Sequence, residues 1–446
     1  MWTVPVRLGA LTVAMALASL PVQAERLSLV QAAQAVLQQN PDLAASKARI
    51  QQAEAGFKQA EGARMPRVNL SLTASRSNDA LNAFGLKLGQ ERISAADFAP
   101  ASLNDPAAIN NFNTRIEVQA PLYTGGQINA RQDEARAMIR AAQSGDEAAR
   151  QQLLLNTLKA YQAVHLARAY IRVAEQSLKA ASEVARVTES LHQQGMAVKS
   201  DRLSARVNVE EAKLRVKEAK RHEADALDQL KMLMGRPLQD EIDVGDEALP
   251  KLPAGNAEDL RTQAINQHPG LKALRNRMDA ANAGINAARG AKKPQVSVMA
   301  RQDWNDRTLG FDASSYTVAG MLSWNAFDAG ISDAAVDRAQ AIRLEQTANL
   351  RQSEDGVALQ ITTSHRRAQE AGERVEVREA AVKDAEEAQR LTQIRYQNGV
   401  TTLVDWFSAQ AQLDKARADH AQARHDSSVA RGEVLHAAGL LTPEQF

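Results

Sequence analysis

The sequence of 446 residues contains no cysteine and only 4% aromatic residues. Without cysteine, the chain cannot have a disulfide framework, a thiolate metal site, a cysteine nucleophile or a mature N-terminus anchored through a lipidated cysteine. A formal net charge of +1 provides no basic field that would favour nucleic acid as a partner. Because aromatic residues are scarce while alanine and long polar side chains are abundant, we expect long helices rather than a thick globular core.

Residues 1–24 have the pattern of a signal peptide. Arg7 precedes an apolar run over residues 8–20, and the small residues at both ends of Val22–Ala24 suit a signal peptidase. The run of about 13 residues is shorter than the roughly 20 that a membrane-spanning helix needs. We therefore expect cleavage before Glu25 and export. No later stretch is apolar enough for such a helix, so a membrane part would have to be built from strands.

Motifs of catalytic and metal sites are also missing. The eight histidines are scattered, and His420 and His425 are five residues apart, a spacing that does not place two zinc ligands on one helical face. The sequence has no phosphate-binding glycine loop and no nucleophile elbow. We expect neither an enzyme nor a metal or other cofactor.

The chain does contain an internal duplication. From Tyr123 to Gly235 and from Phe327 to Gly439, corresponding residues keep an offset of 204 without a gap. Each copy has a proline-started β segment, a glycine turn, a very long helix, a Gly…Asp turn and a shorter helix that ends in glycine. The landmarks are Pro66, Gly126, Gly195, Asp201, Ser204, Ala205 and Gly235 in the first copy, and Pro294, Gly330, Gly399, Asp405, Ser408, Ala409 and Gly439 in the second. The sequence therefore predicts two copies of one unit.

The duplication sets the domain boundaries. We divide the chain into a signal peptide (1–24), a first repeat (25–235), a connecting segment (236–259) and a second repeat (260–446). Helices are expected over residues 28–39 and 42–64, and a copy of the second one over 270–292. The first repeat holds about 24 extra residues, which fall within 78–113 and are predicted to form a long loop. The connecting segment is expected to form a belt midway along the molecule.

Four segments alternate between apolar and polar residues and are predicted as strands, at about 66–76, 114–124, 294–304 and 315–327. Their apolar positions are Val68, Leu70, Leu72 and Ala74; Ile116, Val118, Ala120 and Leu122; Val296, Val298 and Ala300; and Tyr316, Val318, Gly320, Leu322 and Trp324. Two hairpins lying on a helical core are one interpretation. In an exported chain with aromatic residues at the strand ends, a membrane β-barrel is the better one.

Four strands cannot close a barrel alone, because about eight are needed. Several chains must then share one barrel. Three copies give twelve strands and room for a water-filled lumen, whereas two give eight strands and a filled interior. We favour a homotrimer.

Two very long helices follow the strands. Residues 127–193 and 331–397 contain no proline, and each stretch would form a helix about 100 Å long. Each helix is expected to turn at a glycine and to return over residues 201–234 or 405–438 as an antiparallel coiled coil. The returning helices carry alanine at every seventh position: Ala205, Ala212, Ala219 and Ala226, and Ala409, Ala416, Ala423 and Ala430. Such small seams suit a curved wall of helices.

Together these features resemble the TolC-like outer-membrane efflux channels of Gram-negative bacteria, over essentially the whole mature chain. The specific segments are Pro121–Gly126 with its copy Asn325–Gly330, and the turns Gly195–Ala205 and Gly399–Ala409. The resemblance implies a mainly α fold with a membrane β part: a homotrimer that shares a 12-stranded barrel in the outer-membrane lipid and continues as a helical tunnel across the periplasm. It also implies a passive exit duct of a tripartite efflux pump or type I secretion system, docked to a periplasmic adaptor (membrane fusion protein) and an inner-membrane RND or ABC-type transporter.

The resemblance further implies a gate at the periplasmic tip. Asp405 from three chains would form an acidic selectivity ring, with Asp201 nearby, and Tyr396 would act as a latch whose partner is Asp201. Ser408 and Thr401 stand where the best-known family pattern has a second aspartate and an arginine.

The turns themselves would dock the adaptor. The residues assigned to this role are Gly195, Val198, Gly399 and Leu403. From the residues alone, the two glycines are helix C-caps, and the aspartates cap or begin the returning helices. Lys199 and Arg202 are hypothesised to form ion pairs with Asp405 at the tip.

The alternative function is a periplasmic coiled-coil adaptor or structural spacer without a pore. An adaptor would need a globular sandwich or lipoyl-like domain beside one hairpin, whereas this chain has two equivalent hairpins, each led by a strand pair. The channel is therefore the better interpretation. Drugs, metal ions, solvents and secreted polypeptides are all compatible with the sequence as cargo.

Overall fold

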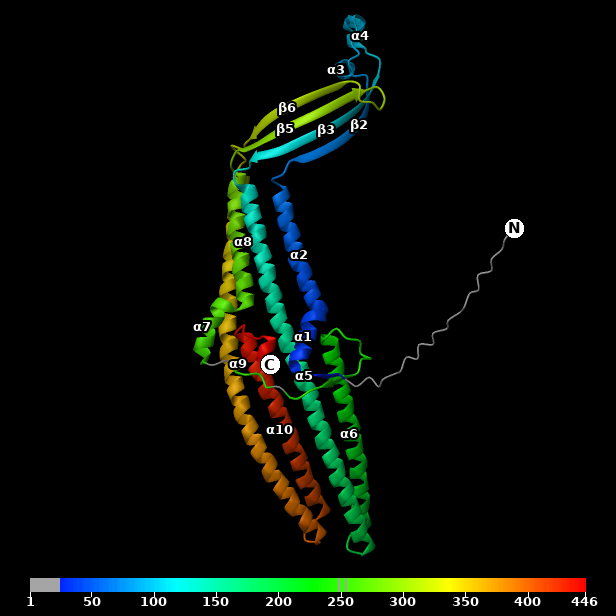
Figure 1. Cartoon of the computed structure of the whole chain (residues 1–446), viewed down its shortest axis with the longest axis vertical. Coiled ribbons are helices and arrows are strands. Elements are labelled where there is room, and N and C mark those ends of the chain that lie inside the picture. The colour runs from blue at the N-terminus through cyan, green and yellow to red at the C-terminus, as the bar shows by residue number, and fades with distance from the viewer. Residues whose placement is uncertain (1–24, 248, 253–254) are drawn as a thin grey trace, which may run out of the picture.

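The computed structural model of the chain describes residues 25–247, 249–252 and 255–446. The predicted signal peptide, residues 1–24, lies outside the described residues. The molecule is long and narrow, with a sheet at one end and two helical hairpin tips at the other, and the C-terminus lies near mid-length (Figure 1). No helix in the described part of the chain combines the length and the apolar character needed to cross a membrane.

The elements repeat as the sequence predicts. The helices are α1 (Leu29–Gln39), α2 (Pro41–Gly62), α3 (Ala80–Gly89), α4 (Pro100–Asn104), α5 (Gln127–Gln193), α6 (Lys199–Leu233), α7 (Ala257–Gln267), α8 (Pro269–Ala291), α9 (Ile331–Gln397) and α10 (Leu403–Ala437), with 3-10 turns η1 (Ala95–Phe98) and η2 (Pro443–Gln445). The strands are β1 (Glu25–Leu27), β2 (Arg67–Ser77), β3 (Ile109–Tyr123), β4 (Ile242–Val244), β5 (Gln295–Asp306) and β6 (Ser314–Ser323). The pairs α5 and α9, and α6 and α10, are equal in length, at 67 and 35 residues.

The four predicted strands form one antiparallel sheet in the order β2-β3-β5-β6. Its register aligns apolar residues in rows on one face, such as Val68, Val118, Ala300 and Val318. The opposite face carries polar rows, such as Asn69, Glu117, Arg301 and Thr317. The apolar face is open, and Leu70 is 73% exposed. Within the described residues, β2 and β6 each pair with one neighbour only, so both outer edges are free.

The segment 78–113 differs from the loop that the sequence predicts. It folds into α3, η1 and α4 at the far end of the sheet, and β3 begins at Ile109 (Figure 1). Asp79 caps α3 by accepting a hydrogen bond from the Asn82 N–H at 2.9 Å. Phe84 and Phe98 pack edge to face with ring centroids 5.7 Å apart, and Lys87 pairs with Asp97. Small local contacts of this kind do not produce a long apolar period that the sequence would reveal.

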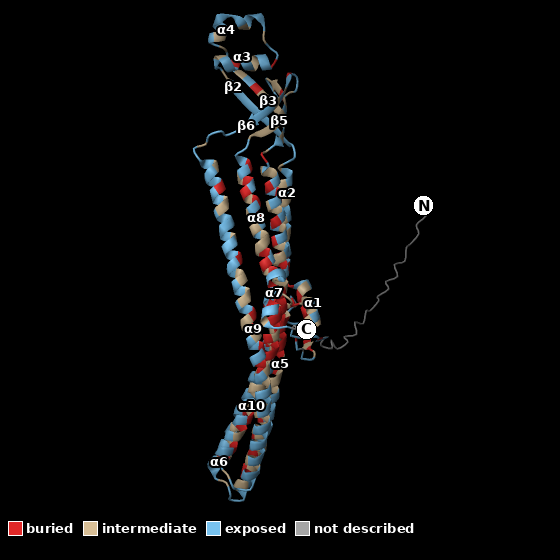
Figure 2. Cartoon of the chain, turned by 90° about the vertical axis from the view of Figure 1, so that its left-hand side faces the viewer, coloured by how far each residue is buried: buried red, intermediate tan, exposed pale blue. Residues whose placement is uncertain are grey.

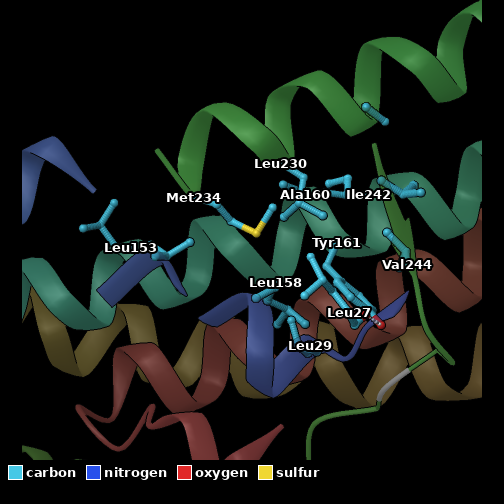
Figure 3. Packing of buried hydrophobic residues seen from close by; sticks show 14 of the residues in the cluster. Leu27, Leu29, Leu153, Leu158, Ala160, Tyr161, Leu230, Met234, Ile242 and Val244 are labelled. Carbon is cyan, nitrogen blue, oxygen red and sulfur yellow. Dashed lines mark hydrogen bonds between the residues drawn. The ribbon is translucent and has the colours of Figure 1, made fainter. Parts of the chain in front are cut away.

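The main core lies near mid-length, where the first repeat closes around Tyr161 (Figure 3). Tyr161 of α5 has no exposed surface, and its hydroxyl lies 3.1 Å from the carbonyl oxygens of Leu27 and Asp246. Leu29 of α1 and Leu230 of α6 pack beside it. Burial in this cluster raises the pKa of Tyr161 to about 12.

The connecting segment ties the two repeats together at this level. Its strand β4 pairs in parallel with β1. Arg168 of α5 binds Asp243 of β4 at 2.5 Å and Glu223 of α6 at 2.8 Å. Arg424 of α10 binds Glu247, in the same segment, at 2.5 Å. The segment is thus attached to both helical hairpins.

Candidate functional site at the hairpin tips

Both helical hairpins turn through the same backbone geometry. Gly195 and Gly399 follow α5 and α9 with left-handed φ angles of 75° and 68°. The residues after them, Met196 and Val400, donate their N–H groups to the carbonyls of Leu191 and Arg395, each at 2.8 Å. This arrangement satisfies the last free carbonyls of each long helix, and it requires a residue that tolerates positive φ. Both glycines thus stand directly after the C-cap residues Gln194 and Asn398 and end the long helices.

Asp405 closes the start of α10. The helix has a capping box, in which the Asp405 N–H donates to the Thr402 hydroxyl and the Thr402 N–H donates to the Asp405 carboxylate, at 3.2 and 3.0 Å. The hydroxyls of Thr401 and Thr402 donate to the same carboxylate oxygen, both at 2.7 Å. These hydrogen bonds lower the pKa of Asp405 to about 2, so the exposed side chain is ionised throughout the physiological range.

The start of α6 is built differently. Its N-cap is Val198, which offers no side-chain hydrogen bond, and Asp201 lies in the first turn. Arg202 reaches Glu189 of α5, with 3.6 Å between the charged atoms. Within the described chain no ion pair joins Lys199 or Arg202 to Asp405, so the hypothesised tip ion pairs are not formed inside one protomer.

Tyr396 joins the two hairpins. Its hydroxyl lies 2.7 Å from the hydroxyl of Thr188 on α5, and both side chains are buried. Burial raises the pKa of Tyr396, the Thr188 hydrogen bond lowers it, and the charge of Asp201 raises it further. Inside one protomer, then, the hydrogen-bonding partner of Tyr396 is Thr188, while Asp201 acts on it through its charge.

An aromatic contact that the sequence analysis did not single out lies beside this pair. Trp406 of α10 has no exposed surface and packs edge to face on Phe407, with centroids 5.7 Å apart. It belongs to a cluster drawn from all four helices at the tips: Val184, Ala205, Tyr396, Leu403 and Trp406. The first-repeat counterpart of Trp406 is Arg202, so the duplication gives no hint of this packing. A large aromatic residue in an alanine-rich helix was the available signal.

The exposed apolar residues at the turns are Met196, Val198, Val400 and Val404, each of which is 61 to 74% exposed. Leu403, which the sequence analysis assigned to adaptor docking, is only 5% exposed. Its side chain packs under Trp406 because it occupies the first position of α10 and points into the tip cluster. The exposed apolar residues are therefore Val400 and Val404 at this turn, and Met196 and Val198 at the other.

The tips offer hydrogen bonds, ionised carboxylates and apolar contacts. Among the described residues, no group of three or more histidine and acidic side chains is arranged to hold a metal ion. Ser408, which was assigned to the gate, is exposed on α10 one turn after Asp405. The arrangement suits a contact surface that carries an ionised Asp405.

Comparison with known proteins gives a family match along most of the chain. The family model described as "Outer membrane efflux protein" matches residues 12–236 and 260–440. The toluene efflux pump outer membrane protein TtgC of Pseudomonas putida is 22% identical over 66% of this chain and 61% of its own length. This chain thus spans about three fifths of that relative.

Two further matches extend over more of the chain. The cation efflux system protein CusC of Escherichia coli is 22% identical over 85% of this chain and 79% of its own length. The crystal structure of the Campylobacter jejuni CmeC outer membrane channel superposes with a TM-score of 0.79, covering 98% of this chain and 94% of that one at 17% identity. The fold described above is therefore that of CmeC.

Proposed function

Because this chain belongs to the outer membrane efflux protein family, we propose that it is the exit duct of a tripartite efflux pump or of a type I secretion system. The chain is an outer-membrane protein that extends into the periplasm. The family consists of efflux proteins and not of enzymes, and two matched relatives are named as parts of a toluene efflux pump and a cation efflux system. A pore-free coiled-coil spacer does not account for these matches.

The observation that carries the proposal is the isolated four-stranded sheet. One face presents exposed apolar rows, and both edge strands have unpaired outer edges. A sheet in lipid must pair every edge, and four strands are too few to close. Pairing β6 of one copy with β2 of the next in a homotrimer gives a closed barrel of twelve strands, with apolar rows facing lipid and polar rows facing a lumen.

The helices support the same assembly. Four long helices from each of three copies, α5, α6, α9 and α10, form a twelve-helix tunnel below the barrel. In one chain α9 leaves apolar side chains exposed, among them Leu344, Leu359 and Val377. Neighbouring copies would cover them, and that burial would stabilise the trimer by about 25 cal/mol per Å² of apolar surface removed from water.

The tips form the gate and the docking surface. Three copies of Asp405 make an acidic ring that selects cations at the narrow end, with Asp201 and Ser408 beside it. The turns at Gly195 and Gly399 dock a periplasmic adaptor through the exposed Val198, Val400 and Val404, and an inner-membrane RND or ABC-type transporter supplies the energy. Which cargo passes, whether drug, metal ion, solvent or polypeptide, is selected by that transporter.

Single-channel conductance in planar bilayers tests the duct. We expect small, cation-selective openings from the wild-type protein, and larger or less selective ones from Asp405→Ala. Asp201→Ala serves as the comparison variant, because it removes the second tip carboxylate without breaking a capping box. A conducting protein that is indifferent to Asp405 would restrict that residue to helix capping. A monomer that washes off membranes in salt and alkali and never conducts would overturn the duct itself.

A further inference from the structure

A groove of about 490 Å³ lies where the sheet meets the start of α5. It is lined by Ala63, Arg67, Gln119, Pro121, Tyr123, Thr124, Gln127, Ile128, Arg131, Gln295, Val296, Ser297, Met321 and Ser323. Its strand residues, such as Arg67, Gln119 and Ser297, belong to the polar face of the sheet. In the proposed trimer this face borders the lumen, at the point where the tunnel opens into the barrel.

Two arginine side chains line the groove, and no acidic side chain is among its described lining residues. Arg67 of β2 and Arg131 of α5 are exposed on its wall, and neither forms an ion pair with any described residue. None of the described lining residues is acidic. The nearest acid in the strand register, Glu117, stands opposite Asn69 and Arg301 and does not line the groove. The two guanidinium groups therefore face a cavity whose described lining supplies no counter-charge.

The start of α5 adds positive potential to the same wall. Its N-cap is Gly126, and its first turn contains no acidic residue. The Thr124 hydroxyl is 3.5 Å from the Ile128 N–H, at the outer limit of a hydrogen bond. The free N–H groups and the aligned peptide dipoles of a helix give its N-terminus a partial positive charge, which favours anions.

In the second repeat, acidic side chains neutralise the positive N-terminus of the corresponding helix, α9. At the corresponding turn Asp328 replaces Thr124, and it accepts hydrogen bonds from the N–H groups of Gly330 and Ser332 at 3.2 and 3.0 Å. Asp333, in the first turn of α9, pairs with Lys292. The counterpart of Arg131 is Ala335. One copy of the unit thus carries its own anions at this place, whereas the other lacks them and adds arginine.

The remaining lining gives the site its size and its mixed character. Tyr123, Ile128, Val296 and Met321 supply apolar surface, and the amides of Gln119, Gln127 and Gln295 supply donors and acceptors. A single inorganic ion would leave most of this volume empty, whereas an anionic group on an apolar body of drug size would fill it.

We propose that this groove binds small organic anions present in the lumen, molecules that carry a carboxylate, sulfonate or phosphate group on an apolar body. Arg67 and Arg131 bind the anionic group through charge-assisted hydrogen bonds, and the open start of α5 strengthens the site. This assignment of a ligand class rests on the proposed duct, because only a lumen would open this face of the sheet to solutes.

The test is direct binding to the purified full-length mature protein in an uncharged detergent. Naphthalene-1-sulfonate is titrated calorimetrically, and 1-naphthol serves as the neutral ligand with the same apolar body. One variant is Arg67→Gln with Arg131→Gln. The second is Thr124→Asp, which copies the Asp328 cap into the first repeat and keeps both arginines. The control is Arg338→Gln on α9, which removes an exposed arginine that does not line the groove.

We expect sulfonate to bind more tightly than naphthol, and both variants to weaken sulfonate binding by at least about tenfold, the loss expected when charge-assisted contacts are removed. The control should bind like the wild type. Equal sulfonate affinity in the wild type and the double variant would overturn the site. Loss in the double variant with full binding in Thr124→Asp would overturn the role of the helix start.

A phospholipid headgroup carries the same anionic chemistry, so its presence needs a separate measurement. Phosphorus analysis of the detergent-purified protein distinguishes the sources: stoichiometric phospholipid in the wild type that disappears in the double variant would show a lipid site and overturn the assignment to soluble organic anions. Conductance recorded on the same preparations separates this inference from the duct. A conducting protein without sulfonate binding keeps the duct and loses the site, whereas sulfonate binding to a protein that forms no pore loses the duct.

Discussion

Helices α5 and α9 occupy the same place in the two repeats and have the same length of 67 residues, yet α5 contributes 20 buried residues and α9 contributes seven (Figure 2). α5 packs against α1, α2, α6, α8 and α10, whereas α9 packs against α7, α8 and α10. The alanine seams follow the same division, because all four seam alanines of α6 are buried, but only Ala423 and Ala430 are buried in α10. Duplicating a sequence does not duplicate its surroundings.

The difference separates the helix that forms the core of a single chain from the helix whose surface stays exposed in that chain. α5 is the central helix of one protomer, because it packs against α6 and α10 and contributes Tyr161 to the main core. α9 keeps apolar surface exposed that no described element of the same chain covers. Corresponding positions in the two helices therefore form matched pairs, and substitutions at such pairs test the comparison.

The largest effect is expected at Tyr161 and its counterpart His365. Tyr161→Ala empties a site with no exposed surface and should lower the free energy of unfolding by about 3 to 5 kcal/mol. His365→Ala removes a partly exposed side chain of α9 and should cost less than about 1 kcal/mol. Urea denaturation followed by circular dichroism measures both. Similar losses in the two variants would contradict the division between α5 and α9.

The glycine turns that lead into the long helices come next. Gly125 has φ of 64°, and a Cβ there would lie 2.3 Å from the carbonyl oxygen of Gly290. Gly125→Ala should therefore destabilise the protein by about 2 to 4 kcal/mol, since strain adds to a backbone clash. Its counterpart Ala329 already has φ of 54°. Ala329→Gly should change stability by less than about 1 kcal/mol, because relief of strain offsets the freedom gained by the unfolded chain. Thermal melts of both variants decide the matter, and a tolerated Gly125→Ala would show that this close approach is not needed.

The contact between the hairpin tips should have a smaller effect. Tyr396→Phe leaves the Thr188 hydroxyl buried without this partner and should cost about 1 to 2 kcal/mol. Combining it with Thr188→Val, which removes both polar groups, should cost less than the two single changes added together. The double-mutant cycle is measured by denaturation and accompanied by conductance. Strict additivity would mean that the two hydroxyls do not interact.

The smallest effect at neutral pH is expected at His436 and its counterpart Met232. Burial lowers the pKa of His436 to about 4, and the charges of His268 and Lys159 add to this. The unfolded chain, with an ordinary histidine pKa near 6.5, therefore binds more protons between these two values. The stability that depends on neutral His436 is complete above pH 6.5 and is lost as the pH falls toward 4. We expect His436→Met, which copies the first repeat, to flatten the pH dependence of the urea midpoint between pH 7 and 4. An unchanged slope would remove His436 as its source.

The sequence predicted the repeat, the strands, the hairpins and the turn glycines because each leaves a periodic or local signal. The contact between Thr188 and Tyr396 leaves none, since it joins residues 208 positions apart through the packing of two hairpins. The burial of Leu403 and Trp406 depends on the same packing. Two roles were predicted for Asp405, a helix cap and a gate residue, and the capping box supports the helix cap within a single protomer.

The connecting segment has a mechanical consequence for the tips. Asp243 and Glu247, its attachments to α5 and α10, are four residues apart, so the chain between them can extend to no more than about 14 Å. The hairpin ends lie roughly 40 Å further along α5, about 25 residues beyond Arg168. The connecting segment is therefore a short link between the two hairpins, and the part of each hairpin beyond it is about three times longer than this link. A rotation of a few degrees of one hairpin about this level would move its tip by about 2 Å while both attachments of the connecting segment stay in place.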